Sequence, residues 1–291
     1  MKQKIIDDFK GLGEMVEIPC SSKHSSGQLV HVCKETGLVR VKELRSAETI
    51  AKAWSNEVYS DDFGKDTYTA RVPAVKARQT YVADFADVNI GLKDKILCDI
   101  GAGEGQFLEI ITGDEYQAKA FGIEPSEKNC NSLSESGFNN FNGTIEDYAE
   151  SDQFEENKFD IITVMWTLVN SYSCLDMVNI AHKMLKPGGY LVVAEGSRIM
   201  VPFKKPLHMY FSHLPVDLHP YHFSTNSLSN LLKVNNFKIE FINRYIDSDI
   251  LCIIGEKKED KVKENYEVDD YKDVLNFFDR WDKETELYYQ R

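Results

Sequence analysis

The chain has 291 residues, which is more than one compact α/β domain needs. Its 47 acidic residues exceed its 34 basic residues, and the formal net charge of −13 would repel a phosphate backbone, so we expect no nucleic-acid substrate. No apolar run approaches the roughly 20 residues that cross a bilayer, and charges interrupt residues 1–18. We therefore expect a cytoplasmic protein without a signal peptide or a membrane partner.

Two half-complete cysteine motifs stand within residues 1–50. A zinc ribbon surrounds one metal ion with two Cys-x-x-Cys knuckles, but here Lys23 and Thr36 occupy the second and fourth ligand positions. The side chains that remain as zinc ligands are Cys20, His24, His31 and Cys33. Such a site would need an uncommon His-x-Cys spacing, so we expect no bound metal, although the sequence leaves zinc binding open. The pattern favours a metal-free hairpin that covers the cofactor or substrate site.

Residues 51–85 predict helices that cap a binding site. The segment contains the aromatic residues Trp54, Tyr59, Phe63, Tyr68 and Tyr81 among several charges. Tyr59 and Tyr68 are candidates for contact with a ligand. The alternative is that they belong to the core, where aromatic residues at helical spacing are more often found.

A glycine-rich turn follows the predicted buried strand at residues 97–100. Gly101, Gly103 and the next glycine let the backbone approach a ligand closely, and the following helix offers free N–H groups. A dinucleotide fingerprint requires its third glycine where this chain has Gln106. Asp99 can accept a hydrogen bond from an amino group. A cationic amino-acid ligand therefore suits this turn better than a pyrophosphate does.

Further predicted strands span residues 118–124, 141–147, 159–166 and 185–195, and an antiparallel pair spans 238–245 and 249–255. Glu124 ends the second strand, at about the distance from which a carboxylate reaches ribose hydroxyls. The pattern predicts an α/β fold with a Rossmann-like, seven-stranded, mostly parallel sheet whose last strand is antiparallel.

In this order, the blocks between residues 80 and 256 resemble a class I S-adenosylmethionine-dependent methyltransferase. The resemblance implies S-adenosylmethionine as the cofactor. From the methionine end toward the adenine, the residues it implies for cofactor binding are Asp99, Gly101, Ala102, Gly103, Glu124, Pro125, Ile145, Glu146 and Met165. Many small-molecule relatives have Glu-His after the fourth strand, whereas this chain has Val169 and Asn170. A histidine base is therefore missing at that position.

The long connection at residues 196–224 is the place where we expect the general base. It holds four of the seven histidines, and histidine titrates near neutral pH. Long ordered loops usually carry function. The catalytic candidates, in order, are His219 and His222, then Tyr221, then His208 and Glu195. The alternative is that these side chains only pack within a structured loop.

The C-terminal region combines a charged linker with an amphipathic helix. Its apolar residues recur at helical spacing: Tyr271, Val274, Leu275, Phe278, Trp281 and Tyr288. This stripe packs either on the same chain or on a second copy, which would make a homo-oligomer.

The sequence thus predicts a hairpin region at 1–50, capping helices at 51–85, a methyltransferase core at 86–256, and a linker with a helix at 257–291. The cysteine motifs resemble the ribbon that precedes many sugar and surface-polysaccharide methyltransferases. The resemblance implies methyl transfer to a small polar acceptor, a hydroxyl of a nucleotide-linked sugar or surface-glycan intermediate. The alternatives are O- or N-methylation of another secondary metabolite and a methyltransferase-like binding subunit without catalysis.

Overall fold

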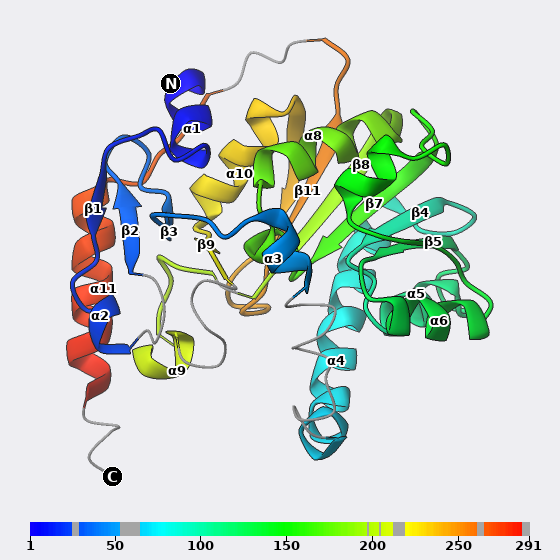
Figure 1. Ribbon diagram of the computed structural model, residues 1–291, viewed down its shortest axis with the longest axis horizontal. Helices are drawn as coiled ribbons and strands as arrows, with labels where there is room; N and C mark the ends of the chain where they lie inside the picture. The colour runs from blue at the N-terminus through cyan, green and yellow to red at the C-terminus, as the bar shows by residue number, and fades with distance from the viewer. Residues whose placement is uncertain are drawn as a thin grey trace.

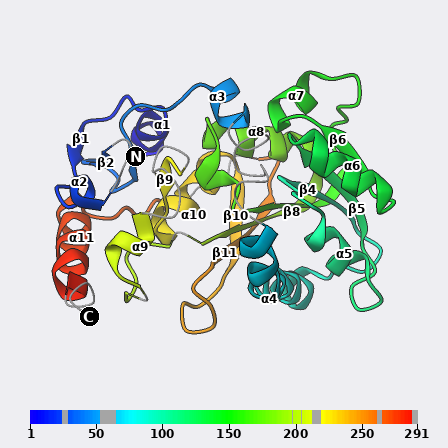
Figure 2. The same ribbon diagram turned by 60° about the horizontal axis from the view of Figure 1, so that its bottom comes forward.

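The computed structural model contains two sheets. It describes residues 1–24, 29–52, 65–196, 198–203, 205–211, 219–260 and 265–286. Figures 1 and 2 show the smaller sheet beside α11 at one end of the molecule, and α5 and α6 at the other end. Of the predicted capping segment, Trp54, Tyr59 and Phe63 lie outside the described residues, as does the side chain of Tyr68.

The larger sheet has seven strands in the order β10-β11-β8-β7-β4-β5-β6. The strands are β4 (Ile96–Ile100), β5 (Lys119–Glu124), β6 (Asn139–Asn142), β7 (Phe159–Met165), β8 (Leu185–Glu195), β10 (Phe237–Ile242) and β11 (Leu251–Lys257). The strand β11 pairs antiparallel with both β8 and β10, and the other neighbouring strands of this sheet pair parallel. The predicted α/β fold with a seven-stranded, mostly parallel sheet is confirmed.

One predicted strand ends earlier than the sequence pattern suggested. The expected strand at 141–147 stops at Asn142, and α7 (Ile145–Glu150) begins shortly after it. Thr144 caps this helix: its hydroxyl accepts from the Asp147 backbone N–H, while the Asp147 carboxylate accepts from the Thr144 N–H. This capping box makes a helix start more favourable than further strand.

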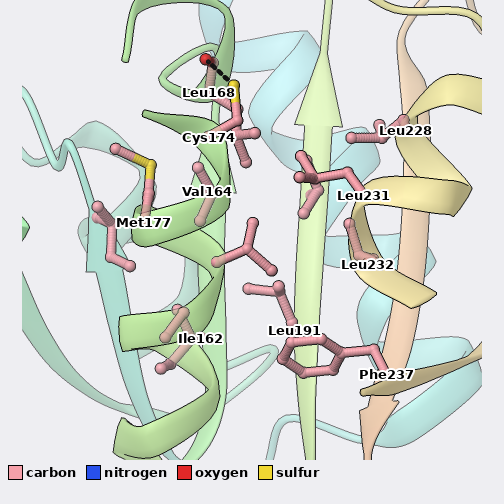
Figure 3. Close-up of a cluster of buried hydrophobic side chains, with 14 of the residues drawn as sticks. Ile162, Val164, Leu168, Cys174, Met177, Leu191, Leu228, Leu231, Leu232 and Phe237 are labelled. Atoms are coloured by element: carbon pink, nitrogen blue, oxygen red, sulfur yellow. Dashed lines mark hydrogen bonds between the residues drawn. The ribbon is translucent and has the colours of Figure 1, made fainter. Parts of the chain in front are cut away.

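Helices cover both faces of the larger sheet. On one face lie α7, α8 (Cys174–Met184) and α10 (Thr225–Val234), and on the other lie α4 (Lys65–Ile90), α5 (Gln106–Thr112) and α6 (Glu127–Glu135). Figure 3 shows α8 and α10 packing buried side chains against the sheet, among them Ile162, Leu191 and Leu231. In the part of the chain that the structure describes, none of the helices is long and apolar enough to cross a membrane.

The smaller sheet joins the N-terminal region to the long connection after β8. It is antiparallel and contains β1 (Met15–Glu17), β2 (Val30–Cys33), β3 (Val39–Val41) and β9 (Tyr221–His222). Around it lie α1 (Lys2–Phe9), α2 (Ser21–His24), α9 (Leu207–Phe211) and α11 (Tyr271–Thr285), and α3 (Ala47–Lys52) follows β3 along the chain. Because β9 pairs with β3, the N-terminal strands fix the position of the residues around His219.

The candidate zinc ligands have other contacts. Cys20 Sγ lies 3.7 Å from the Phe278 carbonyl oxygen, and His24 Nε2 lies 2.6 Å from Asp282 Oδ1. Cys33 is buried in the core. Among the described residues, no three His, Cys, Asp or Glu side chains are grouped as a metal site would require.

The C-terminal helix uses its apolar face within the chain. Val274, Phe278 and Trp281 are buried in one cluster with the valines of β2 and β3. Phe278 stacks on Phe211, and the Trp281 indole N–H donates to the Lys205 carbonyl at 2.7 Å. The helix therefore packs on its own chain, and the structure gives no support to a homo-oligomer through this face. Tyr288 lies outside the described residues.

Replacing Trp281 with phenylalanine is expected to lower the free energy of unfolding by about 1–3 kcal/mol. The substitution keeps an aromatic ring but leaves the Lys205 carbonyl without its donor. Urea denaturation followed by circular dichroism measures the change. Lys283→Ala, on the exposed side of the same helix, should stay within about 0.5 kcal/mol of the parent. Equal stability of Trp281→Phe and the parent would contradict the docking role of this bond.

Candidate functional site

A cavity of about 440 Å³ lies at the carboxyl ends of β4, β5 and β7. This is the edge of an open α/β sheet where ligands bind, and the volume is typical of a small-molecule site. All nine residues predicted for the cofactor line it: Asp99, Gly101, Ala102, Gly103, Glu124, Pro125, Ile145, Glu146 and Met165. The fold thus brings together residues from three strands, from the segments that follow β4 and β5, and from the start of α7.

Gly101 is required by both conformation and space. Its φ of +79° lies in the left-handed region. A Cβ at this position would lie 2.9 Å from Thr167 Cγ2 and closer still to Thr167 Oγ1. The turn therefore brings the backbone next to β7 with no room for a side chain.

Two buried carboxylates face the cavity. Asp99 is 2% exposed, and its Oδ1 accepts from the Thr163 hydroxyl at 2.6 Å. Burial raises the pKa of Asp99 to about 7, and the nearby Glu124 adds to this increase. Glu124 accepts from the backbone N–H groups of Gly103 at 2.9 Å and Ser126 at 3.0 Å, and burial raises its pKa as well. These bonds fix the acceptor groups that a ligand with amino and hydroxyl groups needs.

Around Ile145, Glu146 and Met165 the cavity lining combines apolar and polar groups. Ile145 and Met165 are buried apolar side chains that line it. Glu146, next to Ile145 on the first turn of α7, is mostly buried, and this burial raises its carboxyl pKa. A flat heteroaromatic ring with an exocyclic amine fits such a lining, because the apolar groups can contact its faces and the carboxyl group its edge.

His219 is the catalytic candidate that the structure places at the cavity. Its Nδ1 is hydrogen-bonded to Asn170 Oδ1, while the Asn170 amide donates to the Trp166 carbonyl at 2.7 Å. Because Asn170 offers its oxygen to the histidine, Nδ1 carries the proton and Nε2 the lone pair. Burial lowers the pKa of His219 to about 4, with a further contribution from Lys205. The ring is therefore neutral at physiological pH and has the tautomer of a base.

His222 and Tyr221 are not among the residues that line this cavity, so the structure does not bring them together with His219 there. Both belong to β9, and pairing with β3 draws their side chains into packed surroundings. His222 Nδ1 lies 3.0 Å from the Tyr210 hydroxyl, and burial lowers the His222 pKa to about 3. Tyr221 is fully buried and stacks on Phe223.

The two lower-ranked candidates also lie outside the cavity lining. Glu195 Oε1 accepts from the backbone N–H groups of Leu168 at 2.8 Å and Val169 at 3.3 Å. It thereby holds the 3₁₀ helix Leu168–Asn170, from which Asn170 reaches His219. Burial raises the pKa of Glu195 to about 8. His208 lies on α9 and is not among the cavity residues.

Several cavity residues had no role in the sequence-based predictions. Among them are Ile50, Val75, Gln79, Trp166, Thr167, Asn170, Ser171, Tyr172 and Met177. Trp166 has a φ of +52°, which is rare for a bulky residue and is often found at functional sites. The sequence carried one signal for this group: Asn170 stands where many relatives have a histidine.

Comparisons with known proteins bear on the family and the fold of the chain. A protein family described as a methyltransferase domain matches residues 75–240. One similar solved structure is a Burkholderia thailandensis 1,6-didemethyltoxoflavin-N1-methyltransferase with bound 1,6-didemethyltoxoflavin and S-adenosylhomocysteine. It has 13% identity and a TM-score of 0.55, and the match covers 77% of this chain and 96% of that chain.

A second similar structure is a putative Haloferax volcanii methyltransferase in complex with the Trm112 methyltransferase activator. It has 13% identity and a TM-score of 0.54, and the match covers 74% of this chain and 100% of that chain. At these identities the likeness establishes the shared fold. A search among curated proteins gave no match.

Proposed function

The chain belongs to the methyltransferase domain family, and from this premise we propose that it transfers a methyl group from S-adenosylmethionine to a small polar acceptor, with His219 as the general base. One observation carries the proposal. The hydrogen-bonded pair His219 and Asn170 lines the same cavity as all nine residues predicted for the cofactor.

The cofactor residues divide by chemistry. Asp99 accepts from the ammonium group at the methionine end, and Glu124 accepts from the ribose hydroxyls. Ile145 and Met165 contact the adenine faces, and Glu146 accepts from the adenine amino group. When bound, S-adenosylmethionine supplies an electrophilic methyl group on a sulfonium. The protein aligns the acceptor with that group and manages the proton.

His219 takes the proton of the acceptor hydroxyl at Nε2. The bound cofactor would supply the methyl group to the acceptor oxygen and keep the electron pair of its carbon–sulfur bond, and the proton that the oxygen loses would go to His219. His219 becomes an imidazolium, and Asn170 Oδ1 continues to accept from its Nδ1–H. Asn170 thus acts as a positioning residue, because it fixes the tautomer before the reaction and the ring orientation during it.

For the acceptor we propose a hydroxyl of a nucleotide-linked sugar or surface-glycan intermediate. The support is the resemblance of the motifs at Cys20 and Cys33 to the ribbon of sugar methyltransferases. Two polar atoms of the cavity residues, Gln79 Oε1 and Trp166 Nε1, also support a polar acceptor. Both residues line the cavity, and neither atom has a hydrogen-bond partner within the described chain.

The test combines native mass spectrometry with a transfer assay. Purified protein is first examined for bound S-adenosylmethionine or S-adenosylhomocysteine, and then incubated with methyl-labelled S-adenosylmethionine and a panel of nucleotide sugars. We expect cofactor binding and label transfer to a member of the panel. If the protein does not bind added S-adenosylmethionine, the proposal is wrong. Cofactor binding without transfer to any acceptor would favour the binding subunit.

We expect cofactor affinity to fall as the pH falls below about 7. Burial raises the pKa of Asp99 to about 7, and the protonated carboxyl no longer attracts the ammonium group. The dissociation constant of S-adenosylhomocysteine should rise up to about tenfold per pH unit below that value. Isothermal titration calorimetry at several pH values measures it. Asp99→Asn should bind weakly with a flatter pH profile, and an unchanged profile in this variant would assign the dependence to another group.

A further inference from the structure

Tyr172 is an exposed aromatic residue of the cavity lining, and it lies at the end where His219 is found. Its backbone carbonyl accepts from the Tyr221 hydroxyl at 3.4 Å, and Tyr221 follows His219 by two residues. Asn170, two residues before Tyr172, is hydrogen-bonded to His219. Because two residues span at most about 7 Å, both contacts place Tyr172 next to the proposed base.

The ring of Tyr172 is available to a ligand. Tyr172 is 48% exposed although its carbonyl is held, and no aromatic ring among the described residues stacks on it. The buried apolar side chains of Ile50 and Met177 line the same cavity. An aromatic side chain in such a lining can contact the flat or apolar face of a ligand. The lining therefore suits a ring that presents an apolar face.

The charges of the lining oppose an anionic ligand. His219 is neutral above its pKa of about 4, and Lys205, which contributes to this value, is not among the lining residues. Gln79 Oε1 is an acceptor without a donor in the part of the chain that the structure describes, and it would repel an anion. None of the described lining residues is a lysine or an arginine, and the acidic ones are Asp99, Glu104, Glu124 and Glu146. A phosphate or carboxylate of the acceptor would therefore lack a counter-charge in this cavity.

We infer that the acceptor enters this cavity with an uncharged ring that carries the reacting hydroxyl group, and that Tyr172 stacks on the apolar face of that ring. The inference rests on the proposed function, because it describes the acceptor of His219. A sugar ring and a phenol share this chemistry, since each combines an apolar face with hydroxyl groups at its edge. A nucleotide-linked sugar would bring its sugar ring to Tyr172 and leave its phosphates outside the lining.

The test compares two pairs of probes, each with a neutral and an anionic member of similar shape. One pair is methyl glucoside and methyl glucuronide, and the other is para-hydroxybenzamide and para-hydroxybenzoate. Saturation-transfer NMR titrations of the full-length protein at neutral pH give the dissociation constants. We expect the neutral member of at least one pair to bind, at least about tenfold more tightly than its anionic partner. The pair that responds identifies the ring as a sugar or a phenol.

Variants of Tyr172 test its part in binding. Tyr172→Ala should weaken binding of the neutral probe by about three- to tenfold, because it removes the stacking ring. Tyr172→Phe keeps the ring and should recover most of this loss. The matched control is Ile246→Ala, which should leave probe binding unchanged. Ile246 is an exposed apolar side chain and is not among the cavity residues.

S-adenosylhomocysteine affinity separates this inference from the proposed function. It should be the same in Tyr172→Ala and the parent, and the probe titrations need no cofactor. A protein that binds a neutral probe through Tyr172 but binds no S-adenosylhomocysteine would support the ring site and contradict the proposed function. The inference is wrong if neither neutral probe binds, if the anionic members bind as tightly, or if folded Tyr172→Ala binds the neutral probe as tightly as the parent.

Discussion

Replacing Gly101 with alanine should weaken S-adenosylmethionine binding by at least about 100-fold, equivalent to about 2.7 kcal/mol. The left-handed backbone at Gly101 costs a side chain about 1–2 kcal/mol. In addition, the new Cβ would collide with Thr167, so the turn must move away from β7 and out of the position that lines the cavity. Calorimetry with S-adenosylhomocysteine measures the loss, and circular dichroism checks that the variant is folded.

Gly137→Ala separates the effect of conformation from that of contact. Gly137 has a similar φ of +84°, and a Cβ there would meet no described atom within 4 Å. This variant should lose about 1 kcal/mol of stability but retain cofactor affinity. Adding Thr167→Ala to Gly101→Ala should recover part of the binding, since it removes the two nearest clashing atoms. Equal affinity of Gly101→Ala and the parent would exclude this turn as the cofactor site.

The residues that line the proposed cofactor half of the cavity could be predicted because they follow strands that are visible in the sequence. Asp99 and Glu124 come at the ends of apolar runs, and parallel strands bring such ends to one edge. The apolar run of each strand was therefore enough to predict that the acidic residue at its end lies at this edge of the sheet. The fold class followed from the same strands for the same reason.

The acceptor half depends on contacts between distant segments, which periodicity does not encode. His219 meets Asn170 across 49 residues of sequence, and Gln79 reaches the cavity from α4. Because His219 and His222 flank Pro220 closely, the sequence predicted both equally as the general base. The structure separates these two histidines. His222 belongs to β9, which pairs with β3, and its side chain therefore points into a packed face of the smaller sheet. That pairing joins the N-terminal region to the long connection, and no local signal predicts it.

Replacing His219 with alanine should lower kcat by about 10²–10⁴-fold while S-adenosylhomocysteine affinity changes by less than about twofold. The loss reflects the missing proton acceptor, since the residues proposed to bind the cofactor remain in place. Label transfer to the acceptor identified in the nucleotide-sugar panel gives the rate. The control is His182→Gln, which should keep the parent rate. His182 lies on α8, packs on Phe237 and is not among the cavity residues. A His219→Ala enzyme with undiminished kcat would eliminate this base.

The pH profile tests the role of Asn170 separately. With a His219 pKa of about 4, the base is already neutral above that value, so kcat/KM for the acceptor, measured at saturating cofactor, should be flat between about pH 6 and 8 in the parent. Asn170→Asp still accepts from Nδ1–H, but its negative charge favours the imidazolium and raises the His219 pKa. The rate should then fall on the acid side at a higher pH than in the parent, while at about pH 8 it stays within tenfold. Asn170→Ala loses the tautomer control and should be slower at every pH. If the rate of Asn170→Asp falls on the acid side at the same pH as the rate of the parent, the proton is taken by a group that does not contact Asn170.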